Sequence, residues 1–141
     1  MNYLLDTCVI SELVRPIPDK NVIHWLSHTP SERLFLSVIT IGEIRKGITK
    51  LPESKKKNHL TNWLNILLED YQERIYPINL SVAENWGNIQ GKAENCGTPL
   101  PSVDSLIAAI AHTYNLIVVT RNENDFAATN VTIMNPWKNS E

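Results

Sequence analysis

Short apolar runs along this chain end abruptly at polar residues. The runs at 3–5 and 34–37 are each followed by a helical pattern, which predicts buried strands that lead into helices. Residues 116–120 give the clearest strand pattern, because their apolar, β-branched centre suits a sheet covered on both faces. The segment 75–78 contains a proline and is predicted as an edge strand or connector, and 131–134 as a short final strand.

Apolar residues at three- and four-residue spacing predict helices between these strands. Ser54 and Ser102 are expected to be N-caps, and Ser81 with Glu84 has the form of a capping box. The predicted helices cover approximately residues 22–26, 40–50, 55–71, 81–94 and 103–114. Strands that alternate with helices favour a three-layer α/β/α sandwich with a mostly parallel central sheet.

Composition limits the class of protein further. With 141 residues, 43% of them hydrophobic, the chain is expected to form one domain spanning 1–141. Cys8 and Cys96 form no CxxC pair, so neither a disulfide scaffold nor a cysteine zinc site is indicated. The longest apolar run, 106–111, is too short for a membrane span, and no basic leader opens the chain, so a cytoplasmic protein is expected.

Acidic and amide side chains follow the predicted strands closely. Asp6 follows the first strand, Glu43 begins the helix after the second, Asp104 begins another helix, and Asn122 and Asp125 follow the strand that ends at 120. Because ligands collect at the carboxyl ends of parallel strands, the fold is expected to bring these side chains to one edge of the sheet. Taken singly, each also has a structural interpretation as a turn residue, a capping-box acid or a partner of a helix dipole.

Clustered carboxylates repel one another and require a compensating charge. Two of them about 5 Å apart repel by roughly 3 kcal/mol at an effective dielectric constant of ~20. Oxygen ligands without histidine or cysteine favour Mg²⁺ or Mn²⁺, which suits phosphodiester hydrolysis by an activated water. The chain has neither the GxxxxGK[ST] loop of nucleotide triphosphatases nor the GxGxxG turn of dinucleotide-binding proteins, so kinase-like and dehydrogenase functions lose support.

Four sequence motifs resemble those of PIN-domain ribonucleases, in the same order and spacing. Within that family the resemblance is to VapC-type toxins of toxin–antitoxin modules, especially the FitB-like branch, which tends to end in Asn-Pro-Trp. The motifs, with that ending, are Asp6–Glu12, Ser37–Glu43 followed by Gly47, Asp104 at the start of an Ile- and Ala-rich helix, Thr120–Phe126, and Asn135–Trp137.

The resemblance implies an α/β/α PIN-like fold and a Mg²⁺- or Mn²⁺-dependent endoribonuclease that acts as a toxin. It also implies a homodimer, inhibition by a small cognate antitoxin, and transfer RNA as one target. Carried over by position, the acidic residues of the family fall on Asp6, Glu43 and Asp104, which are the expected metal ligands. The fourth position falls on either Asn122, an uncharged amide, or Asp125.

A local basic stretch offers a path for RNA despite a net charge of −2. Residues 45–57 carry a net charge of +5, so the rest of the chain carries −7. Arg45, Lys46 and Lys50 are therefore candidate phosphate contacts, together with Arg121 beside the acidic residues. The other interpretation of this stretch is a solvated helix end. The other candidate function is a catalytically weak PIN-like module that binds RNA or a protein partner.

Overall fold

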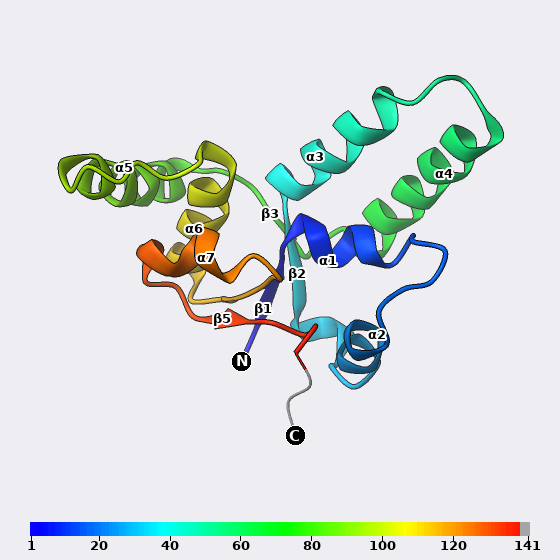
Figure 1. The fold of residues 1–141 in the computed structure, drawn as a ribbon, viewed down its shortest axis with the longest axis horizontal. Coiled ribbons are helices and arrows are strands. Elements are labelled where there is room, and N and C mark those ends of the chain that lie inside the picture. Colours follow the sequence, from blue (N-terminus) through cyan, green and yellow to red (C-terminus); the bar gives the residue numbers. More distant parts are fainter. Residues whose placement is uncertain (139–141) are drawn as a thin grey trace.

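A five-stranded parallel sheet forms the centre of the molecule (Figure 1). The computed structural model describes residues 1–138. The strand order is β3-β2-β1-β4-β5, and all four neighbouring pairs are parallel. The strands are β1 (Tyr3–Leu5), β2 (Leu34–Ser37), β3 (Ile75–Tyr76), β4 (Ile117–Val119) and β5 (Ile133–Met134). The sequence-based prediction of an α/β fold with a parallel sheet is confirmed.

Helices cover both faces of this sheet in two groups. One group of four packs on one face and the other group of three on the opposite face, with the sheet between them (Figure 1). The first group is α1 (Thr7–Glu12), α2 (Lys20–Ser27), α3 (Val38–Thr49) and α4 (Lys55–Asp70); the second is α5 (Leu80–Asn95), α6 (Ser102–Tyr114) and α7 (Glu123–Phe126). Two 3₁₀ turns, η1 (Ser31–Arg33) and η2 (Ala127–Thr129), complete the described elements.

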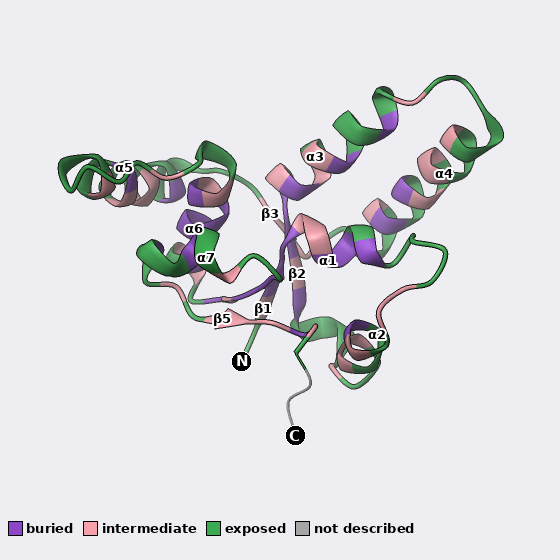
Figure 2. Cartoon of the chain, viewed as in Figure 1, coloured by how far each residue is buried: buried purple, intermediate pink, exposed green. Residues whose placement is uncertain are grey.

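Alternating side chains on the strands build the two halves of the core. Leu5 and Val119 are fully buried against the α1–α4 layer, whereas Leu4 and Val118 are fully buried against the α5–α7 layer. This period of two follows from strand geometry, and most of the central strands β1, β2 and β4 is accordingly buried, whereas the edge strand β5 is of intermediate burial in Figure 2. Within residues 1–138, no helix combines the length and the apolar character that a membrane span requires.

Three helix starts differ from the sequence-based prediction. Asn79, rather than Ser81, caps α5, and its side chain accepts a hydrogen bond from the Val82 N–H. Pro101 precedes α6, so Ser102 is its first helical residue. Ser37 caps α3, which places Glu43 in the second turn instead of in a capping box. Ser37 and Asn79 thus cap their helices with side-chain hydrogen bonds, whereas α6 begins after Pro101 without a side-chain cap.

The carboxyl end of β1 lies at the switch point of the sheet. The chain runs from β1 to β2 and β3 on one side, then returns through α5 and α6 to β4 on the other side of β1. The Asp6 N–H donates to the Val119 carbonyl at 2.9 Å, so pairing continues just past the two strands. Such switch points are where ligands bind in open α/β sheets, because the connections diverge there and leave space.

Burial of α6 against the sheet is expected to dominate the stability of this half of the molecule. Ile107 is fully buried, so Ile107→Ala should lower the free energy of unfolding by about 2–5 kcal/mol, through lost apolar burial and a residual cavity. Ile66 on α4 is 58% exposed, so Ile66→Ala is the matched control and should cost less than about 1 kcal/mol. Urea unfolding followed by circular dichroism measures both, and equal losses would contradict this packing.

Candidate active site

Asp6 is a buried carboxylate at the end of the central strand. Its Oδ1 accepts the Thr7 N–H at 2.8 Å, and its Oδ2 accepts the Thr120 hydroxyl, also at 2.8 Å. Burial raises the pKa of Asp6, hydrogen bonds from Thr120 and Thr7 counter this rise, and the charge of Glu43 adds to it. Asp6 is therefore held in one orientation, with its charge only partly compensated by the protein.

Glu43 is positioned by a row of hydroxyl groups. The Thr7 hydroxyl donates to Glu43 Oε1 and also lies 3.2 Å from the Thr40 hydroxyl. Thr40 in turn lies 3.4 Å from the hydroxyl of Ser37, the N-cap of α3. The row links the ends of β1 and β2 to the second turn of α3, and so ties Glu43 to the segment that carries Asp6.

The pKa of Asp104 responds to the charges of the neighbouring carboxylates. Burial is the largest cause that raises its pKa to about 6, and three neighbouring carboxylates add to the rise: Asp6, Asp125 and Glu43. Side chains from α3, α7 and the end of β1 thus act electrostatically on Asp104 of α6. Asp125 belongs to this group by its effect on Asp104.

Asn122 and Arg121 lie on the loop between β4 and α7. The Asn122 N–H donates to the Thr120 hydroxyl at 3.0 Å, and its side chain is exposed and makes no capping hydrogen bond. Both residues line a shallow cavity of about 450 Å³ together with Asp125 and Lys138. The guanidinium of Arg121 lies over the Trp137 ring, 4.7 Å from its centroid.

The predicted basic residues of α3 are exposed and diverge in direction. Lys46 and Lys50 follow Glu43 by three and seven residues, so they share its stripe of the helix. Arg45 is also exposed but points to a different side, since residues two apart do not share a helix face. The site therefore has a basic extension along one stripe of α3.

Sequence reasoning missed the roles of the hydroxyl groups. Thr7 and Thr120 orient the two carboxylates that they contact, Thr40 supports the hydroxyl of Thr7, and Thr40 and Thr120 are fully buried. The available signal was a polar residue at the point where an apolar strand ends. Cys8, half-buried beside this network, lies 3.7 Å from Asp6 Oδ2, and burial raises the pKa of its thiol, so it acts as a neutral packed side chain.

The donor chemistry of the cluster suits a hard divalent cation. All four acidic groups offer oxygen, and their mutual repulsion would be relieved by a positive ion. Within residues 1–138, however, no three His, Cys, Asp or Glu side chains are spaced to hold a metal ion as they stand. An ion shared by several carboxylates therefore requires rotation of partly exposed side chains, of which Glu43 and Asp104 are two.

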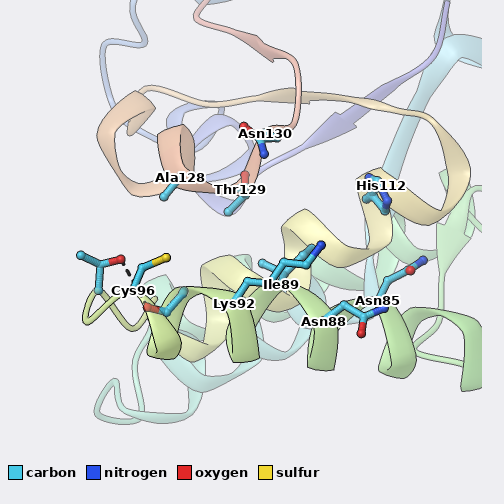
Figure 3. A pocket seen from close by; sticks show the side chains of 11 residues that line it. Asn85, Asn88, Ile89, Lys92, Cys96, His112, Ala128, Thr129 and Asn130 are labelled. Atoms are coloured by element: carbon cyan, nitrogen blue, oxygen red, sulfur yellow. Dashed lines mark hydrogen bonds between the residues drawn. The ribbon is translucent and has the colours of Figure 1, made fainter.

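A second groove, of about 370 Å³, lies away from the acidic cluster (Figure 3). It runs between α5 and η2, with Asn88 and Lys92 on one wall and Thr129 and Asn130 on the other, and His112 of α6 lies at one end. None of the clustered carboxylates lines it. The candidate site is thus an open acidic edge of the sheet, separate from this groove.

Comparison with known proteins places this arrangement in a family. A family model described as "PIN domain" matches residues 3–131. Toxin FitB of Neisseria gonorrhoeae is 39% identical over 135 residues, 95% of this chain and 97% of that protein. VapC ribonuclease Y4jK of Sinorhizobium fredii is 33% identical, over 96% of this chain and 97% of that protein. A structure of FitAB bound to an IR36 DNA fragment has a TM-score of 0.93 and 36% identity, covering 99% and 98% of the two chains.

Repulsion within the acidic cluster should make stability depend on pH through Asp104. Its pKa in the folded chain is about 6, against an ordinary value of 3.8, so the unfolded chain loses its proton first. The folded state therefore loses stability as pH rises from about 3.8 to about 6. We expect Asp104→Asn to be more stable than wild type at neutral pH and nearly equal to it below the ordinary Asp pKa.

Urea unfolding with EDTA present, at pH about 7.5 and about 3.5, measures this difference. Glu84→Gln is the matched control, since it removes one exposed acid on α5, outside the cluster. An Asp104→Asn variant that is no more stable than wild type at neutral pH would show that the cluster carries no strain.

Proposed function

This chain belongs to the PIN-domain family, and we propose that it is a divalent-metal-dependent endoribonuclease that acts as the toxin of a toxin–antitoxin pair. The observation that carries the proposal is the raised pKa of Asp104, to which burial and the charges of Asp6, Asp125 and Glu43 contribute, beside the switch point of the sheet. Such a cluster is costly to the fold, and a phosphodiesterase with a bound cation accounts for it.

Asp6 and Asp104 are the residues that would hold Mg²⁺ or Mn²⁺, with Glu43 completing the shell or orienting the attacking water. A cation held there supplies a water of lowered pKa and offsets negative charge on the phosphoryl oxygens. Thr120 and Thr7 keep Asp6 oriented, and the Thr7 hydroxyl does the same for Glu43. Asp125 is the better candidate for the fourth position than Asn122, because it acts on Asp104 and carries charge.

The RNA substrate would reach this edge along α3. Lys46 and Lys50 extend the stripe of Glu43, and Arg121 stands one residue from Thr120, which contacts Asp6. Contacts from these side chains to phosphate add affinity with little dependence on sequence. Transfer RNA is the proposed target class by family likeness.

The proposed partners are a second copy of this chain and a small antitoxin. Support comes from the relatives, which include a protein named Toxin FitB and a solved FitAB structure similar over nearly the full chain. Exposed apolar side chains on the α1–α4 layer, Val14, Ile17 and Ile66 among them, supply surface for such contacts. The proposed setting is the cytoplasm, where toxin, antitoxin and RNA meet.

Loss of single carboxylates should abolish cleavage. We expect wild type to cut a transfer RNA mixture with Mg²⁺ and not with EDTA. Asp6→Asn, Asp104→Asn and Glu43→Gln should each cut at least about 100-fold more slowly, because each removes a negative charge that would bind the cation or orient the attacking water. Gel electrophoresis of RNA products measures the rates, and the same variants should no longer arrest growth when expressed without antitoxin.

Two further variants separate the candidates for the fourth position. Asp125→Asn should slow cleavage strongly and Asn122→Ala weakly, while Glu84→Gln on α5 should cut at the wild-type rate. Undiminished cutting by Asp6→Asn or Asp104→Asn would defeat the assignment. Retained RNA binding with no Mg²⁺-dependent heat in calorimetry would favour the catalytically weak binding module.

Removal of two lysines should reduce the salt dependence of RNA binding. Lys46→Gln/Lys50→Gln removes two proposed phosphate contacts, so the slope of log K against log salt should fall by about 1.4 for single-stranded RNA. The control is Lys20→Gln/Lys92→Gln, which removes the same charge from α2 and α5 and should leave the slope near wild type. Fluorescence anisotropy of labelled RNA in EDTA measures both, and equal slopes for the two variants would refute the α3 path.

A further inference from the structure

The C-terminal segment 135–138 lies against the loop that leads from β4 into the acidic site. Asn135 and Lys138 contact Glu123, the first residue of α7, and the ring of Trp137 lies beneath Arg121 of the loop. The segment 135–138 thus contacts the loop at position 121 and the start of α7 at position 123. Nothing in the cleavage chemistry uses these contacts.

Trp137 itself is fixed from several directions. Its backbone N–H donates to Asn135 Oδ1 at 3.0 Å, and its backbone carbonyl accepts a hydrogen bond from the side-chain amide of Asn21 on α2, also at 3.0 Å. The half-buried ring packs against the core layer of α1–α4. Its indole Nε1 is buried and has no hydrogen-bond partner within residues 1–138. The ring therefore meets its surroundings through its faces and edges and not through a hydrogen bond.

Arg121 is left with an uncommitted positive charge. Glu123, the nearest acid along the chain, accepts the Asn135 amide at 2.7 Å and pairs with Lys138 at 2.8 Å. Within the described residues, Arg121 takes part in no ion pair, and its cation–π contact is with Trp137. A guanidinium stacked on a ring keeps its N–H donors in plane and available to a phosphate.

We propose that Trp137 is a positioning residue for RNA, which holds the Arg121 guanidinium beside the acidic site so that it grips a substrate phosphate. The inference rests on the proposed ribonuclease function. Arg121 directly follows Thr120, whose hydroxyl contacts Asp6, and Arg121 lines the same cavity as Asp125 of the acidic cluster. A side chain already held in place loses less conformational freedom when it binds a phosphate, which is why the ring should matter to affinity.

The test is a double-mutant cycle on RNA affinity. Labelled single-stranded RNA is titrated in EDTA, so that binding is measured without cleavage, against wild type, Arg121→Gln, Trp137→Leu and the double variant. We expect Trp137→Leu to weaken binding by about three- to tenfold, in line with a partly exposed cation–π pair. Once Arg121 is Gln, Trp137→Leu should cause no further loss, because the ring acts through the guanidinium.

Trp137→Phe is the conservative variant, which tests whether an aromatic ring at this position is enough to maintain RNA binding. It keeps an aromatic face and breaks no hydrogen bond of Nε1 within the described chain, so its affinity should stay within about twofold of wild type. Trp63→Leu is the control for lost indole packing, since Trp63 of α4 packs on the same core layer. It should lower the melting temperature without weakening RNA binding.

Cleavage kinetics separate this inference from the proposed function. With Mg²⁺, Trp137→Leu should raise KM for RNA by the same factor as Kd and leave kcat nearly unchanged, as expected for a residue that acts on binding. The positioning role is wrong if wild type cuts RNA but Trp137→Leu changes neither Kd nor KM. It is also wrong if Trp137→Leu weakens RNA binding by the same factor in the Arg121→Gln background as in wild type. Either result would leave the proposed ribonuclease function intact. A wild-type chain that cuts no RNA would overturn the proposed function and the positioning role with it.

Discussion

Repulsion between carboxylates at the carboxyl ends of the strands is the constraint on which this molecule depends. Asp6 is buried at the end of β1, and burial, with a smaller contribution from three other acids, raises the pKa of Asp104 to about 6. A sheet with helices on both faces brings these groups together, because each βα connection ends its strand at the same edge. The fold tolerates the resulting strain, which a bound cation would relieve.

Hydroxyl groups hold the carboxylates in fixed orientations despite their mutual repulsion. Thr120 and Thr7 donate to Asp6 and Glu43, and Ser37 and Thr40 extend the row to the start of α3. These contacts offer hydrogen bonds without adding charge, so they fix the carboxylates in orientation but leave their repulsion largely in place. Neutralisation by lysine or arginine would have relieved the repulsion and removed the affinity for a cation.

Positive charge is therefore kept at the margins of the acidic edge. Lys46 and Lys50 stand further along α3, and Arg121 lies over Trp137 and forms no ion pair within residues 1–138. Asn135 and Lys138 of the segment 135–138 bind the carboxylate of Glu123, the acid nearest to Arg121 along the chain, which could otherwise pair with Arg121. Acids at the centre with bases around them match an anionic polymer that must be held on both sides of one reacting phosphate.

The sequence by itself determined the alternation of strands and helices, the parallel sheet and the acids that meet at its edge, because these follow from local periodicity and from the rule that strand ends share one side. It did not determine the starts of α3, α5 and α6: Ser37 and Asn79 cap the first two, and α6 begins after Pro101 with no side-chain cap. It also left the choice between Asn122 and Asp125 open, and gave Thr7, Thr120 and Trp137 no role. The contacts of Thr7, Thr120 and Trp137 appear only in the tertiary structure, since they depend on distance and direction between residues up to 116 positions apart, which no local pattern encodes.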